Sequence, residues 1–243
     1  MSLRLAVWSG PRNISTAMMR AWENRGDCAV VDEPLYAHYL AHTGLDHPGR
    51  EAVIAAGEAD WRRVTAWLTG SIPAGKAIWY QKHMTHHLLP HIERGWLGRL
   101  THVFLIRDPR EVLLSYVRSR PNVAAADLGV LQQHEIFDYV RGLTGGTPVV
   151  IDAGQFLRAP AAQLQALCEA LGIPFTERML SWPAGPRASD GVWAPYWYEA
   201  VLRSRGFEPY RERDHTVPHK YQRIIDAVMP SFEALYEMRL RSG

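Results

Sequence analysis

The stretch Ser9–Thr16 contains the residue types of an anion-binding turn. It reads Ser-Gly-Pro-Arg-Asn-Ile-Ser-Thr and lies between the apolar run Leu3–Trp8 and residues that recur at helical spacing. A tight turn between a strand and a helix points free backbone N–H groups at an anion. Arg12 adds a planar cation suited to a phosphate or sulfate. We also expect Ser15 or Thr16 to cap the helix with a hydroxyl group.

This turn is not a Walker A loop. That motif needs a Gly-Lys pair before its Ser or Thr, with the lysine on the phosphates and the hydroxyl on Mg²⁺. No such pair precedes Ser15. The alternative is an ordinary strand-to-helix turn whose hydroxyl only caps the helix, and the turn alone leaves both interpretations open.

A second arginine and a serine follow the clearest predicted strand, residues 101–106. Arg107 lies at the strand end, and Ser115 lies two turns into the helix predicted next. Asp108 as N-cap, a proline at the first helical position and Glu111 at the third predict a capping box. Arg107 and Ser115 could share one phosphate. Alternatively, Arg107 pairs with a neighbouring carboxylate and Ser115 faces solvent.

Further polar groups follow two more predicted strands. The proline after Glu33 predicts an extended Glu33 at the end of the strand 28–31. Ligands of parallel α/β sheets bind where strands end and helices begin. We therefore expect the polar groups at four strand ends to converge on a polyanionic ligand: Arg12, Glu33, Lys82 with His83, and Arg107. Glu33 could instead be a loop carboxylate paired with an arginine.

Three histidines are spaced four residues apart, namely His83, His87 and His91. On a helix this spacing could ligate a metal. However, the sequence has no His-Glu-x-x-His motif and no carboxylate between Ala77 and Ile92. We therefore expect no metal site, and instead a surface or substrate-facing cluster.

The alternation of strands with helices predicts a three-layer α/β fold, in which helices flank a mostly parallel central sheet. The predicted strands are residues 3–8, 28–31, 77–80, 101–106 and 148–151. The predicted helices include residues 48–68, 88–97 and 125–143, and a last helix from 220 that is interrupted at Pro230. We expect a single domain over residues 1–243, with residues 182–243 as a more variable, aromatic-rich and helical C-terminal part.

Composition argues against several classes of protein. The 243 residues are 47% hydrophobic and 21% charged, as in globular proteins. A net charge of +2 gives no support to a nucleic-acid or membrane partner. Cys28 and Cys168 are too few and too far apart for a disulfide framework or a metal knuckle. Because no signal peptide or long apolar run is apparent, we expect a cytoplasmic protein.

Together, the two arginine motifs resemble those of the sulfotransferase family. Ser9–Thr16 resembles the P-R-S-G-S-T loop that holds the 5′-phosphosulfate of 3′-phosphoadenosine 5′-phosphosulfate (PAPS), with Asn-Ile in place of Ser-Gly. Ile106–Pro109 with Ser115 resembles the second signature, which grips the 3′-phosphate. The resemblance covers residues 3–175 and implies a P-loop-like fold. It implies these nucleotide-binding residues: Gly10, Pro11, Arg12, Asn13, Ile14, Ser15, Thr16, Arg107 and Ser115.

The resemblance also implies metal-free, in-line transfer of a sulfuryl group from PAPS to a hydroxyl or amine of a small-molecule acceptor. Arg12 or Lys82 could offset the charge that develops on the leaving phosphate. Glu33 resembles the glutamate of bacterial carbohydrate sulfotransferases, and Lys82-His83 resembles the Lys-Thr-His stretch of the cytosolic ones. We expect Glu33 to be the base, since it follows the next strand in sequence after the anion-binding turn and so has the shorter reach to the sulfur, with His83 as the alternative.

Three other functions remain open at this point. A nucleotide kinase or hydrolase of the same architecture would need Mg²⁺ ligands, and a non-catalytic relative could bind the nucleotide without turnover. A pyridoxal-phosphate enzyme is disfavoured, because only three lysines exist and none lies in a recognisable phosphate-binding motif. The aromatic residues between 182 and 207 either cover the site or build the core.

Overall fold

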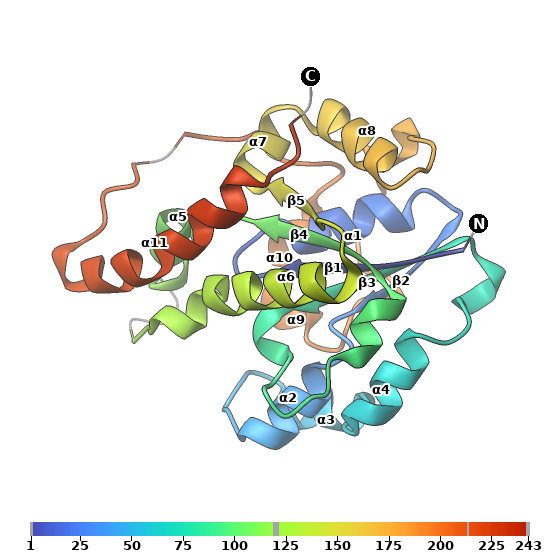
Figure 1. The fold of residues 1–243 in the computed structure, drawn as a ribbon, viewed down its shortest axis with the longest axis horizontal. Coiled ribbons are helices and arrows are strands. Elements are labelled where there is room, and N and C mark those ends of the chain that lie inside the picture. The colour runs from blue at the N-terminus through green and yellow to red at the C-terminus, as the bar shows by residue number, and fades with distance from the viewer. Residues whose placement is uncertain (1, 119–121, 213, 242–243) are drawn as a thin grey trace.

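A five-stranded parallel sheet with the strand order β2-β3-β1-β4-β5 forms the centre of the molecule (Figure 1). The structure, a computed structural model, describes residues 2–118, 122–212 and 214–241. The strands are β1 (Leu3–Ser9), β2 (Cys28–Asp32), β3 (Ile78–Met84), β4 (Thr101–Ile106) and β5 (Val149–Asp152). The last residue of β1, Ser9, pairs with Met84 of β3 and Leu105 of β4, so three strands end level with one another. The predicted fold class is confirmed.

Helices cover both faces of this sheet because its strands are apolar on both sides. In β1, Leu5 and Val7 pack on one face and Ala6 and Trp8 on the other. The first face is covered by α1 (Ser15–Glu23), α7 (Ala153–Arg158) and α8 (Pro160–Ala170). The second is covered by α4 (Trp61–Leu68), α5 (Pro109–Tyr116), α6 (Val130–Thr144) and α11 (Gln222–Glu237), with α6 and α11 in front in Figure 1.

A third apolar cluster builds on the helix that follows β2. Tyr36 and Leu40 pack there with Trp193 and Tyr198, which come from far along the chain. Its helices are α2 (Tyr36–Thr43), α3 (Arg50–Ala56), α9 (Ala194–Trp197) and α10 (Glu199–Arg203). This cluster adjoins the ends of β2 and β3, where functional groups were predicted.

Several predicted helices are wrong in extent. Residues 48–68 form two helices, since α3 ends at Ala56, Gly57 after it is extended, and the Asp60 side chain caps α4 by accepting the N–H of Arg62. Residues 88–97 are mostly irregular. Gly129, with φ of 74°, separates a short 3-10 turn from α6. The 3-10 turns are η1 (Pro73–Gly75), η2 (Thr85–His87), η3 (Gly95–Arg99), η4 (Ala125–Leu128), η5 (Glu177–Met179) and η6 (His219–Tyr221).

Two further differences concern a strand and the last helix. The third strand runs on to Met84, so Lys82 and His83 lie within it rather than after it. The helix α11 continues through Pro230, so the predicted interruption is wrong. None of the helices in the described ranges is long and apolar enough to cross a membrane.

Candidate functional site

The turn after β1 is fixed by close packing and holds one strained residue. A Cβ on Gly10 would lie 2.6 Å from the carbonyl oxygen of Leu128, so only glycine fits there. Arg12 has a φ of 57°. This left-handed conformation costs a non-glycine residue about 1–3 kcal/mol, and such strain concentrates at functional sites. The anion-binding role of this turn stays a prediction.

Asn13 anchors the turn, and no hydroxyl caps the helix. Its Nδ2 donates to the carbonyl oxygen of Leu105 at 2.8 Å, and its Oδ1 accepts the N–H of Ile14 at 2.8 Å. Ile14 is the N-cap of α1, and the described part of the chain gives it no side-chain cap. The predicted hydroxyl cap is therefore wrong. Because a helix cannot satisfy its own first N–H groups, those from Ser15 and Thr16 onward can face an anion.

The two arginine motifs meet at the ends of β1 and β4. The Nε of Arg12 donates to the Oγ of Ser115 at 2.9 Å. The Nη1 of Arg107 donates to the carbonyl oxygen of Arg12, also at 2.9 Å. Arg12 is exposed, while Arg107 and Ser115 are half-buried. The structure therefore brings Arg12, Arg107 and Ser115 into one basic corner, although Arg12 is about a hundred residues from the other two in sequence.

Arg107 also pairs with a buried carboxylate. Its Nε and Nη2 donate to Oε2 of Glu111 at 2.9 and 2.7 Å, and Oε1 of Glu111 accepts the hydroxyl of Tyr210 at 2.8 Å. Asp108 caps α5 as predicted. Glu111 does not complete the predicted capping box, because its carboxylate pairs with Arg107. Within the described residues, three of the five N–H groups of Arg107 are used, so two can still bind an anion.

Lys82 is the centre of a buried polar network at the ends of β2 and β3. Its side chain is 1% exposed. Its Nζ donates to Asp32 Oδ1 at 2.8 Å, to Glu33 Oε1 at 2.6 Å and to the Tyr198 hydroxyl at 2.7 Å. Burial alone would lower the pKa of Lys82, but the charges of Asp32 and Glu33 raise it well above its usual value. Lys82 is therefore a cation whose three N–H donors are all used.

Tyr198 is a member of this network that sequence reasoning missed. Its hydroxyl donates to Asp32 Oδ2 at 2.6 Å and accepts from Trp193 Nε1 at 3.1 Å. From the sequence, the aromatic residues between 182 and 207 were expected either to cover the site or to build the core. Nothing in its spacing separates the buried Tyr198 from Tyr196 and Trp197, which are exposed.

Glu33 faces the network from a strained backbone position. Its φ is 42°, so the predicted extended conformation is wrong, and its N–H donates to the carbonyl oxygen of Lys82. The side chain is 11% exposed, and its Oε2 lies 3.9 Å from Nδ1 of His87. Burial raises the pKa of Glu33 by more than the charge of Lys82 lowers it. A carboxylate with a raised pKa is a stronger base, because its affinity for a proton is greater.

His83 lies on the opposite face of β3 from Lys82, because successive strand residues point to opposite faces. Its ring stacks on Trp8 with centroids 4.4 Å apart, and the residue is only 2% exposed. Burial lowers the pKa of His83 to about 3. The expectation that Lys82 and His83 occupy the same corner of the site is therefore wrong.

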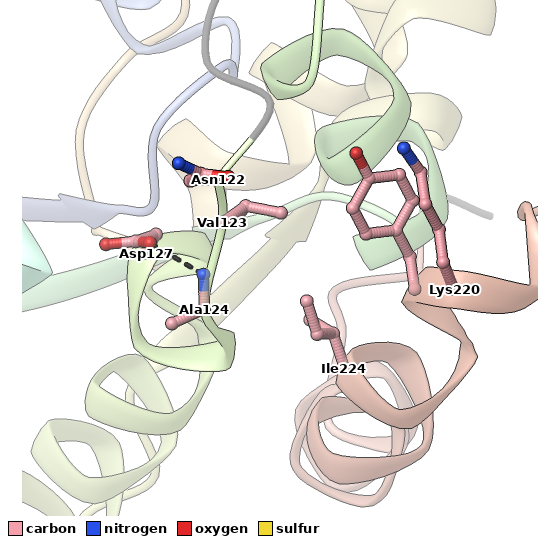
Figure 2. A pocket seen from close by; sticks show the side chains of 7 residues that line it. Asn122, Val123, Ala124, Asp127, Lys220 and Ile224 are labelled. Carbon is pink, nitrogen blue, oxygen red and sulfur yellow. Dashed lines mark hydrogen bonds between the residues drawn. The ribbon is translucent and has the colours of Figure 1, made fainter.

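A separate cavity of about 570 Å³ lies beside the start of α11 (Figure 2). Asn122, Val123, Ala124 and Asp127 line one side of it, and Lys220, Tyr221 and Ile224 line the other. None of the predicted site residues lines this cavity. We therefore assign it no part in the site described above.

Comparisons of sequence place this chain among known proteins. Residues 3–239 match a family model described as a sulfotransferase domain, so the family likeness extends well beyond residue 175. Two Arabidopsis thaliana proteins, branched-chain-amino-acid aminotransferase-like proteins 2 and 1, are 33% and 36% identical over 229 residues. The match covers 94% of this chain but only 40% of either relative, so the chain spans well under half of their length.

Solved structures share the fold at low sequence identity. The sulfotransferase domain of a Synechococcus PCC 7002 olefin synthase has a TM-score of 0.58 at 18% identity, covering 96% of this chain and 94% of that one. A sulfotransferase from Alicyclobacillus acidocaldarius has a TM-score of 0.58 at 12% identity, covering 99% and 98%. A mouse sulfotransferase complexed with PAP has a TM-score of 0.51 at 12% identity, covering 97% and 88%. Because the family match runs over nearly the whole chain, this protein belongs to the sulfotransferase family.

Proposed function

We propose that this protein transfers the sulfuryl group of PAPS to a hydroxyl or amine of a small-molecule acceptor, without a metal. The convergence of Arg12, Arg107 and Ser115 carries the proposal. PAPS has negative charge at its 5′-phosphosulfate and at its 3′-phosphate. The turn after β1 and the first amides of α1 suit the first group, and Arg107 with Ser115 suits the second. The complex of the mouse sulfotransferase with PAP supports the same choice of nucleotide.

In the proposed reaction the acceptor oxygen or nitrogen attacks the sulfur, and the bond between sulfur and the phosphate oxygen breaks. The products are the sulfated acceptor and 3′-phosphoadenosine 5′-phosphate (PAP). Arg12 offsets the charge that develops on the leaving phosphate. Glu33 takes the acceptor's proton, for which its raised pKa suits it.

We assign Lys82 a positioning role rather than a contact with the sulfuryl group. Its three N–H donors are used by Asp32, Glu33 and Tyr198. An ammonium group has no further donor to offer the sulfuryl oxygens. Lys82 instead holds the Glu33 carboxylate in place, 2.6 Å away, and opposes its protonation.

We do not carry the aminotransferase-like names of the plant relatives over to this chain. A pyridoxal-phosphate enzyme needs a lysine whose amine can become neutral and form a Schiff base. Lys82 is buried as a cation between carboxylates. Lys76 is exposed and donates to the carbonyl oxygen of Gly26, and Lys220 is exposed beside Tyr221.

The proposal predicts a definite order of nucleotide affinity. In calorimetry with EDTA present, PAP should bind the wild-type protein more tightly than ATP does, because only PAP carries a 3′-phosphate for Arg107. Added Mg²⁺ should leave the PAP affinity unchanged, since this turn has no Walker lysine and no Mg²⁺-dependent phosphate site is proposed. Tighter binding of ATP with Mg²⁺ would favour the kinase or hydrolase interpretation instead.

A further inference from the structure

Three histidines from two segments meet beside the third apolar cluster. His38 and His42 lie one turn apart on α2, and His91 comes from the irregular segment after η2. The Nε2 atoms of His38 and His91 are 2.9 Å apart, and the rings of His42 and His91 have centroids 4.1 Å apart. One ring nitrogen from each histidine lies within 4.8 Å of the other two. The partners of His91 are therefore the α2 histidines, not His87, with which its sequence spacing had paired it.

The hydrogen bonds of His38 determine where its proton lies. Its Nδ1 is 2.7 Å from the carbonyl oxygen of Ala59, and only an N–H can bond a carbonyl oxygen. The Nε2 of neutral His38 therefore presents a lone pair, to which the Nε2 of His91 donates across 2.9 Å. A buried histidine that bonds a carbonyl through one nitrogen and presents the other is oriented as metal-ligating histidines are.

We propose that His38, His42 and His91 bind one divalent transition metal ion, of the class that imidazole favours, such as Zn²⁺ or Co²⁺. With Zn–N bonds of about 2.0–2.1 Å, tetrahedral geometry sets its nitrogen ligands about 3.3–3.4 Å apart. His38 and His91 must separate slightly and His42 must approach. Both adjustments are within reach, because His42 and His91 are exposed and can change rotamer.

The surroundings favour the neutral form of His91. Loss of hydration, followed by the charges of His42, His38 and Arg62, lowers the pKa of His91. A neutral imidazole is the form that binds a metal. On binding, the Nε2 proton of His91 moves to its Nδ1, and the metal takes the place of the hydrogen bond between His38 and His91. A water molecule would complete a four-coordinate site.

The metal site would stabilise the segments next to Glu33 without contacting Glu33 itself. The α2 helix begins three residues after Glu33, and the ring of Tyr36 stacks on His87 of η2 with centroids 4.6 Å apart. A metal held by His38, His42 and His91 links α2 to the chain that leaves η2. This is a structural site, and it stands apart from the proposed transfer of a sulfuryl group.

Cobalt titration tests this inference. Protein without a histidine tag, stripped with chelator and dialysed, should bind one equivalent of Co²⁺ and show the visible absorption of tetrahedral cobalt, which Zn²⁺ abolishes. At metal concentrations a hundredfold above Kd, the Tm should rise by about 5–10 °C. The buried cysteines, Cys28 and Cys168, should not contribute.

Single-histidine variants separate this site from adventitious binding. His42→Ala and His91→Ala remove exposed side chains, so both should fold with a metal-free Tm near that of the wild type. Each should weaken Co²⁺ binding at least about tenfold, by comparison with the loss of outer-shell partners. His134→Ala, which removes a partly exposed histidine from α6, should bind as the wild type does. The proposal is overturned if wild type shows no tetrahedral band, or if His42→Ala and His91→Ala bind Co²⁺ as tightly as His134→Ala does. PAP binding is measured in EDTA, so it does not depend on the metal. Failure of the metal-site proposal can therefore be distinguished from failure of the proposed sulfuryl transfer.

Discussion

Glu33→Gln should lower kcat by about 10²–10⁴-fold, the usual share of general-base catalysis. Glutamine keeps an oxygen that accepts from Lys82, so the buried network stays bonded while the proton acceptor is lost. PAP affinity should stay nearly unchanged, because Glu33 is not part of the basic corner of Arg12, Arg107 and Ser115. The rate is measured as transfer of labelled sulfate from PAPS to an acceptor found by screening small alcohols, phenols and amines.

Asp32→Asn is the matched control for Glu33→Gln. It removes the negative charge of a carboxylate that binds Lys82, but it leaves Glu33 in place. It should therefore cost much less in kcat, as should His83→Ala on the other face of β3. In the wild type, kcat should fall as the pH drops through the raised pKa of Glu33, since only the carboxylate accepts a proton. A nearly active Glu33→Gln with an inactive His83→Ala would reverse the assignment of the base.

Lys82→Met should lower the free energy of unfolding by about 3–5 kcal/mol, because it leaves two buried carboxylates without their cation. Asp32 and Glu33 are both within 2.8 Å of its Nζ, and the side chain is 1% exposed. Urea denaturation near pH 7 measures the loss. The loss should shrink as the pH falls through the raised pKa of Glu33, because protonation of Glu33 removes part of the uncompensated charge.

Lys76→Met is the control for the loss of a lysine as such. Lys76 is exposed, and its Nζ donates to a backbone carbonyl oxygen. Its replacement should change the free energy of unfolding by no more than about 0.5 kcal/mol. If Lys82→Met costs as little as Lys76→Met, the network of Lys82, Asp32, Glu33 and Tyr198 is not the buried cluster described above.

Local patterns predict the parts of this fold that depend on neighbouring residues. The strands β1, β2, β4 and β5 are short apolar runs between turn residues, and all four were located from the sequence. Arg12 lies in the turn after β1 and Arg107 follows β4 directly, and parallel strands bring their carboxyl ends to one edge, so the meeting of the two arginines could be expected. That Ser115 binds Arg12 is a consequence of the same arrangement.

Features that depend on distant residues could not be predicted in this way. The third strand was ended too early because Gln81, Lys82 and His83 are polar, yet all three are buried and paired to neighbouring strands. Tyr198 reaches Lys82 across 116 residues of sequence. The positive φ of Glu33 runs against the preference of a residue before proline, and it occurs together with backbone hydrogen bonds to Lys82 and Tyr36.

The central claim is that Arg107 recognises the 3′-phosphate of PAPS, and one calorimetric comparison tests it most directly. Arg107→Ala should weaken PAP binding by about 10–150-fold, the value of a hydrogen bond to a charged group, while AMP binding changes little. Arg110→Ala, which removes a neighbouring arginine paired with Asp108, should leave both affinities close to those of the wild type. Equal losses for PAP and AMP in Arg107→Ala, or no loss for either, would contradict the account.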